Sequence, residues 1–183
     1  MKIVSRICTT LAVRERVGGS RGRLYKVALA WTGDRMLADD LVQEAIAIGL
    51  SKGHQLRDLE KLYPWLYSIL NNCWRRHLRS QQPDSGCEPD SLACETTLEQ
   101  QVERQRIVQD VRQAVFRLSV GQREVISLVD LEGFSYADVA EILEIPIGTV
   151  MSRLNRARKA LQQTLRRMNP EVEPDVALLR RVR

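Results

Sequence analysis

The stretch FSYADVAEILEIPIGTVMSRLNRARKAL, residues 134–161, has the pattern of two helices joined by a tight turn. Ser135 is a good N-cap for the first helix, and Asp138 can complete a capping box. Pro146 cannot continue that helix, because it lacks an N–H and disfavours a helical conformation at the residue before it, but it is well tolerated at the start of the next helix. Residues 134–161 therefore predict a helix-turn-helix.

The second helix of this pair is apolar on one side and basic on the others. The apolar stripe consists of Val150, Leu154, Ala157 and Leu161, and the other faces carry Arg153, Arg156, Arg158 and Lys159. A helix of this kind fits the DNA major groove. The alternative is a surface hairpin with a solvated basic face. The capped first helix, the tight turn and the absence of acids among the basic residues favour DNA binding.

Composition predicts an all-α chain. The 183 residues suffice for one domain or two small ones, and 44% of them are hydrophobic. Only 5% are aromatic, and alternating runs rich in Val, Ile and Thr are absent. The net charge of +5 is compatible with a polyanionic partner but does not require one.

The cysteines indicate neither a metal site nor a disulfide framework, because their spacing fits no zinc-finger or CxxC pattern. We interpret Cys8, Cys73, Cys87 and Cys94 as free thiols in a reducing cytoplasm. No apolar run approaches the roughly 18–20 residues that span a bilayer. Residues 1–22 begin with basic residues but lack a signal-peptide cleavage site, so they read as an N-terminal extension.

Two amphipathic helices are expected near the N-terminus, at residues 23–32 and 35–50. Gly33 suits the C-terminal end of the first, and Asp34 can cap the second. The outer faces of the second carry Asp39, Asp40, Gln43 and Glu44. Spacing alone indicates an ordinary solvated helix face for these residues.

A third helix, PWLYSILNNCWRRHLRS, is expected at residues 64–80, with Pro64 at its first position. Its C-terminal part mixes Arg75, Arg76 and Arg79 with aromatic and amide side chains. This composition is typical of segments that bind single-stranded nucleic acid. The equal alternative is that the aromatics belong to a core and the arginines favour the helix C-terminus.

Residues 81–100 predict a flexible, acidic linker between two domains, because they contain prolines and a glycine and no basic residue. Beyond it we expect a long helix at residues 98–117 and another at residues 120–131. Ser119 can cap the second of these, and Gly133 can end it.

Three blocks of the chain resemble the extracytoplasmic-function (ECF, group 4) sigma factors of the sigma-70 family. They are LYKVALAWTGD with LADDLVQEAI, then PWLYSILNNCWRRHLRS, then residues 118–161. The resemblance implies an all-α chain with two small helical domains, sigma region 2 and the helix-turn-helix of sigma region 4. The implied division is an N-terminal extension (1–22), region 2 (23–80), the linker (81–100), region 4 (101–167) and a C-terminal tail (168–183).

The resemblance also implies a function. Such a protein binds core RNA polymerase, at the clamp helices of the largest subunit and the flap of the second largest. It directs the polymerase to the −10 and −35 elements of promoter DNA, promotes melting, and is controlled by an anti-sigma factor. It acts in the cytoplasm and has no catalysis, cofactor, metal or small-molecule substrate of its own.

The family's functional residues map onto three sets. Binding to core polymerase is expected of Asp39, Asp40, Leu41, Gln43 and Glu44. Recognition and melting of the −10 element is expected of Tyr67, Asn71, Asn72, Trp74, Arg75, Arg76 and Arg79. Recognition of the −35 element is expected of Thr149, Met151, Ser152, Arg153, Asn155, Arg156 and Lys159. Within the second set, Asn72 would hold a base flipped out of the non-template strand.

Three positions depart from the family pattern. Met151 stands where Lys or Arg is common, and Arg76 where Asp or Asn is frequent. Glu144 replaces a frequent Gly, so we expect the turn of the helix-turn-helix to adopt another geometry. These departures concern the preferred DNA sequence and not the class of protein.

Two other functions remain as alternatives. A free-standing helix-turn-helix regulator would leave the DDLVQE helix and the helix at 64–80 unexplained. A decoy that only binds an anti-sigma factor would have no need of the DNA-reading residues. An enzyme is least favoured, because the sequence contains no phosphate-binding loop, metal motif or catalytic constellation.

Overall fold

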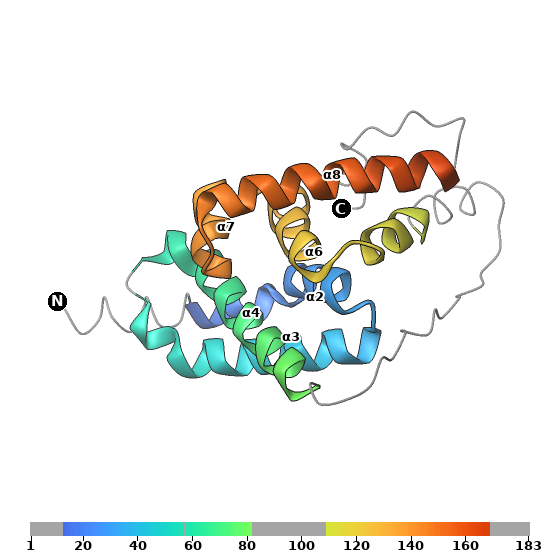
Figure 1. Cartoon of the computed structure of the whole chain (residues 1–183). Helices are drawn as coiled ribbons and strands as arrows, with labels where there is room; N and C mark the ends of the chain where they lie inside the picture. Colours follow the sequence, from blue (N-terminus) through green and yellow to red (C-terminus); the bar gives the residue numbers. More distant parts are fainter. Residues whose placement is uncertain (1–12, 57, 82–108, 169–183) are drawn as a thin grey trace.

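The computed structural model describes residues 13–56, 58–81 and 109–168. Every regular element within these ranges is a helix, which confirms the all-α prediction. Most of the predicted linker, the start of the helix expected at residues 98–117 and the C-terminal tail lie outside the described residues. The described residues form an N-terminal lobe (13–56 and 58–81) and a C-terminal lobe (109–168), coloured from blue to green and from yellow to red in Figure 1.

The N-terminal lobe is a bundle of three main helices. These are α2 (Arg21–Thr32), α3 (Arg35–Lys52) and α4 (Leu62–Ser80), preceded by helical residues 13–19. The short 3₁₀ turns Gly53–Gln55 and Leu59–Lys61 connect α3 to α4. The bundle buries one apolar stripe from each helix, including Leu24, Leu41 and Leu66.

The predicted junction between the first two helices is confirmed. Gly33 adopts a left-handed conformation with a φ of 71°, and its N–H donates to the Leu29 carbonyl. Asp34 Oδ1 accepts from the backbone N–H groups of Met36 (2.7 Å) and Leu37 (3.1 Å), which leaves two fewer unpaired donors at the start of α3.

The prediction that Pro64 is the first residue of its helix is wrong, since α4 begins two residues earlier at Leu62. Pro64 still lies in the first turn, where backbone N–H groups have no intrahelical acceptor. The 3₁₀ turn Leu59–Lys61 runs directly into α4, so the chain is already wound before the proline is reached.

The C-terminal lobe contains helical residues 109–116, α6 (Val120–Ile126), α7 (Tyr136–Leu143) and α8 (Ile147–Met168). The predicted apolar stripe of α8, from Val150 to Leu161, is buried against α6 and α7. Both predicted caps form capping boxes, Ser119 with Gln122 and Ser135 with Asp138. The helix expected at 120–131 is α-helical only to Ile126 and continues as a π-helical turn, η3 (Ser127–Leu131).

The expectation of a different turn geometry at Glu144 is wrong. Glu144 adopts the left-handed conformation itself, with φ 52° and ψ 47°. It is the one described non-glycine residue with a positive φ. The turn is held by the N–H of Ile145, which donates to the Ala140 carbonyl at 3.1 Å. The turn thus keeps the left-handed conformation that commonly ends a helix, although this conformation is sterically unfavourable for a residue with a side chain.

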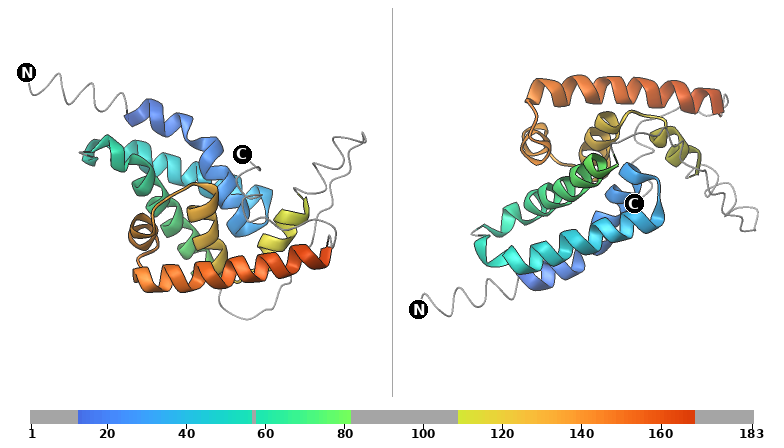
Figure 2. Two further views of the ribbon diagram at one scale, coloured as in Figure 1. Left: turned by 90° about the horizontal axis from the view of Figure 1, so that it is seen from above. Right: turned by 60° about the horizontal axis from the view of Figure 1, so that its bottom comes forward.

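The two lobes pack directly on each other. In Figure 1, α7 lies against α4, and α6 lies above α2. Both views of Figure 2 agree with this arrangement, with α8 outermost and α6 and α7 between α8 and the N-terminal bundle. The buried apolar side chains of both lobes form one continuous core. Contacts between the lobes therefore decide which of the predicted site residues reach solvent.

Candidate nucleic-acid interface

The outer side of α8 carries five of the seven residues predicted for the −35 element. Met151, Ser152, Asn155, Arg156 and Lys159 are exposed and form what we term the open face of α8. The helix presents them outward because its opposite stripe is buried on α6 and α7. Thr149 and Arg153 of the predicted set are partly buried.

Arg153 turns toward the interior of the C-terminal lobe. A Cβ added at Gly121 would lie 2.7 Å from Arg153 Nη1, so the guanidinium lies directly over this glycine. Burial raises the pKa of the nearby Glu124 carboxyl, and the positive charges of Arg75 and Arg153 partly oppose that rise. Arg153 therefore compensates a buried acid in addition to any role on DNA.

Arg158 is committed to a structural ion pair, although the sequence places it on the basic faces of α8. Its Nε and Nη2 donate to Asp130 Oδ2 (3.1 Å) and Oδ1 (2.6 Å), a two-pronged arrangement. The Asp130 side chain is only 6% exposed. This pair ties α8 to η3 and sets the orientation of the open face of α8.

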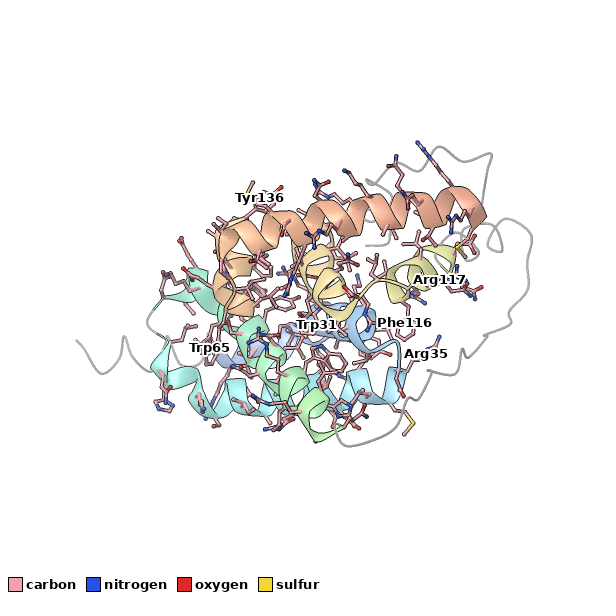
Figure 3. The ribbon with its side chains drawn as sticks, in the orientation of Figure 1. Trp31, Arg35, Trp65, Phe116, Arg117 and Tyr136 are labelled. Carbon is pink, nitrogen blue, oxygen red and sulfur yellow. The ribbon has the colours of Figure 1, made fainter. Side chains whose placement is uncertain are left out.

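Apart from Arg75, the residues predicted for the −10 element fall into two groups. Asn72, Arg76 and Arg79 are exposed on α4 (Figure 3 shows the side chains of this helix). Tyr67, Asn71 and Trp74 are buried, with 0%, 1% and 5% of their surface exposed. Arg75 is partly buried. In this arrangement, the second group cannot contact a DNA strand.

The end of α7 and the turn that follows it cover this part of α4 at Asn71 and Arg75. Asn71 Nδ2 donates to the Ile142 carbonyl at 3.1 Å. Arg75 donates to the Leu143 carbonyl and forms an ion pair with Glu144 at 3.4 Å. The C-terminal end of α7 has unpaired carbonyls, and the amide and guanidinium of α4 supply the donors that they need.

The predicted polymerase-binding helix, α3, is largely accessible. Asp40 and Gln43 are exposed, and Asp39 and Glu44 are partly exposed. Leu41 is 4% exposed and belongs to the core, so the structure does not place it among surface contacts.

Two of the acids of α3, Asp39 and Glu44, already have partners within the N-terminal lobe. Asp39 accepts from Arg21 at 2.7 Å and from Gln43 at 2.8 Å, and these hydrogen bonds lower the pKa of its carboxyl. Glu44 forms an ion pair with Arg76 of α4. The predicted polymerase-binding and −10 sets therefore touch each other through this pair.

Sequence reasoning missed the remaining contacts between the lobes. Trp31 Nε1 donates to Ser127 Oγ at 2.7 Å, in the π-helical turn. Arg23 donates to Glu132 Oε2 from Nε (2.9 Å) and Nη2 (2.7 Å). These partners are 96 and 109 positions apart, so no local pattern links them. A π-helical turn is often a functional feature, but the sequence here carries no signal for it.

The described residues contain no group of His, Cys, Asp and Glu side chains suited to a metal ion. Cys73 is buried and free, and burial raises the pKa of its thiol to about 11. The other three cysteines lie outside the described residues. In the part of the chain that the structure describes, no helix is sufficiently long and apolar to cross a membrane.

Comparison with known proteins gives two matches to family models. Residues 18–83 match the model described as Sigma-70 region 2, and residues 109–161 match that described as Sigma-70, region 4. The chain is 33% identical over 144 residues to the ECF RNA polymerase sigma factor EcfG of Rhodopseudomonas palustris, covering 78% of each chain. It is 30% identical over 155 residues to the RNA polymerase sigma-H factor of Pseudomonas aeruginosa, covering 78% of this chain and 80% of the relative.

A solved structure is also similar. It is a co-crystal structure of the sigma factor RpoE in complex with the anti-sigma factor NepR from Bartonella quintana. The similarity has a TM-score of 0.70 and 30% sequence identity, and it covers 83% of this chain and 95% of that one.

Proposed function

Because the chain belongs to the ECF sigma factors of the sigma-70 family, we propose a division of its work between the two lobes. As a sigma factor, the protein binds core RNA polymerase and promoter DNA to start transcription. We assign polymerase binding and the −10 element to the N-terminal lobe, and the −35 element to the C-terminal lobe. The observation that carries this assignment is the open face of α8, a polar and basic surface on a helix whose other side is fully buried.

On the open face of α8, the proposed roles follow from side-chain chemistry. Arg156 and Asn155 offer donors that can read guanine and adenine edges in the major groove, and Lys159 offers a charge for a phosphate. Met151 has no donor and is 53% exposed, so it can only contact apolar groups such as a thymine methyl. Its presence where Lys or Arg is common favours a different −35 sequence.

For the −10 element, we assign first contact to the exposed residues of α4. Asn72 has a short amide that can hydrogen-bond the edge of a flipped base, and Arg79 can attract the phosphates beside it. For core polymerase, we assign Asp40 and Gln43 of α3, which are exposed. Asp39 and Glu44 can join them after releasing Arg21 and Arg76.

We further propose control by an anti-sigma factor, since the similar RpoE structure is a complex with the anti-sigma factor NepR. The place of action is the cytoplasm, where RNA polymerase works on DNA. No catalysis by the chain itself is needed, because the polymerase carries out the chemistry.

The decisive experiment mixes the purified chain with core RNA polymerase and a promoter library, and then sequences the transcripts. We expect discrete start sites that share −10 and −35 motifs. Binding to core without transcripts would favour a decoy of an anti-sigma factor. DNA binding without any association with core would identify a free-standing regulator.

A further inference from the structure

The helix α8 is longer than the part of it that carries the open face. The match to Sigma-70, region 4 ends at residue 161, whereas α8 continues to Met168. The turns beyond the match expose Gln163, Arg166 and Arg167, which we term the distal end of α8. We propose that the distal end of α8 binds backbone phosphates of promoter DNA beside the −35 element. This inference rests on the proposed function.

The distal end lies on the same side of the helix as the open face. Side chains seven residues apart on an α-helix point in nearly the same direction, because two turns take about 7.2 residues. Ser152, Lys159 and Arg166 have this spacing, and all three are exposed. A surface that faces DNA at Ser152 and Lys159 therefore continues along the helix to Arg166.

Packing holds α8 in this direction up to its last turn. Leu161 is 1% exposed, and the partly buried Leu165 and Met168 pack against the core. In Figure 1 and Figure 2, the last turns of α8 lie beside helical residues 109–116. The C-terminal lobe thus supports the distal end and keeps it aligned with the open face.

The arginines of the distal end have no acid to neutralise them. Arg158 of the same helix is paired with Asp130, whereas neither Arg166 nor Arg167 forms an ion pair within the described part of the chain. Residues 145–168 contain no Asp or Glu. This surface is therefore complementary to a polyanion along its whole length, and DNA is the polyanion that the open face binds.

Helix length places the distal end at the edge of the DNA groove. At about 1.5 Å per residue, Arg166 lies about 15 Å along the helix from Arg156. The major groove is about 12 Å wide and winds around the duplex, so a straight helix leaves it after a few turns. With Arg156 at the base edges, α8 passes over the sugar–phosphate backbone near its distal end. An arginine at that point meets phosphates, which its guanidinium can bind through two parallel hydrogen bonds.

The test removes both charges from the full chain by combining Arg166→Gln with Arg167→Gln. Glutamine has a helix propensity close to that of arginine, so α8 should stay intact. The control combines Arg14→Gln with Arg16→Gln, which removes the same charge from exposed positions of the N-terminal lobe. Wild type and both variants are combined with core RNA polymerase, and their affinity for a selected promoter is measured at rising salt concentration.

The salt dependence reports the number of phosphate contacts. Each lost contact lowers the slope of log affinity against log salt concentration by about 0.9, so the distal-end variant should have a slope smaller by about 1.8. Raising the salt from about 50 to about 200 mM should then weaken wild-type binding roughly tenfold more than variant binding. The control should keep the wild-type slope. Scrambling the −35 element should weaken all three proteins by the same factor, because phosphate contacts carry no direct sequence information.

Methylphosphonate linkages, which remove the charge of single phosphates, locate the contact. They are placed one at a time beside the −35 element on either strand of the promoter. We expect a few neighbouring linkages to weaken the wild type and the control and to leave the distal-end variant unaffected. If every linkage affects the three proteins equally, the phosphate contact is overturned.

The remaining outcomes separate this inference from the proposed function. If the distal-end variant keeps the salt slope of the control and only its thermal unfolding shifts, its arginines serve the helix dipole and the inference is overturned. A loss of preference for the −35 sequence would overturn it in favour of base reading, and a loss of core binding in favour of a polymerase contact. If the wild type itself does not distinguish the promoter from scrambled DNA, the proposed function fails and the inference falls with it.

Discussion

Gly33, at the end of α2, lies against the ring of Phe116 from the other lobe, and its replacement by alanine tests this contact. A Cβ added at Gly33 would lie 2.6 Å from Phe116 Cδ2, inside the ring's van der Waals surface. Gly33 also has a φ of 71°, which strains any L side chain. We estimate about 1–2 kcal/mol for the strain and about 1–3 kcal/mol for the overlap.

The chain supplies a matched control for this substitution. Gly133 has a φ of 78°, and a Cβ there would meet nothing within 4 Å. Gly133→Ala should therefore cost only the strain, about 1–2 kcal/mol. The difference between the two variants isolates the overlap with Phe116.

Urea unfolding followed by circular dichroism measures both variants. Because Gly33 and Phe116 belong to different lobes, part of the loss can appear as lobe separation, which tryptophan quenching detects. The double variant Gly33→Ala with Phe116→Ala should show a favourable interaction energy of about 1–3 kcal/mol, since the overlap is gone. The reasoning is refuted if Gly33→Ala matches Gly133→Ala in both unfolding midpoint and quenching.

Three further predictions concern single side chains. Asn72→Ala should weaken open-complex formation more than initial promoter binding. Permanganate footprinting measures open-complex formation and filter binding measures promoter binding, and an equal loss in both would contradict the prediction. Arg156→Ala should weaken −35 duplex binding by about 1–3 kcal/mol and leave core association intact, whereas a fall in core binding would show that the C-terminal assignment is wrong. Burial raises the pKa of the Glu124 carboxyl above its ordinary value of 4.5. The native state should therefore become less stable as pH rises from about 4.5 through the pKa that Glu124 has in the folded protein. Glu124→Gln should abolish that dependence in urea titrations, and an unchanged pH profile would contradict it.

The sequence by itself determined the local elements of this protein. The caps at Asp34, Ser119 and Ser135, the helix-ending Gly33 and the stripe of α8 depend on groups a few residues apart, so their spacing carries the information. The open face of α8 was predictable for the same reason, because a regular helix that buries one stripe exposes the opposite one.

Only the tertiary structure decided which of the remaining predicted residues reach solvent. Asn71 and Asn72 are adjacent and chemically identical, yet one is 1% exposed and the other is open to solvent. Their difference is set by α7, whose Ile142 carbonyl lies 71 positions away. Likewise, the residue types of Glu144 and Arg158 do not predict what the structure shows. Glu144 adopts the left-handed conformation of the turn, and Arg158 forms a structural ion pair. Contacts between distant segments depend on how whole helices pack, and the local sequence pattern does not predict them.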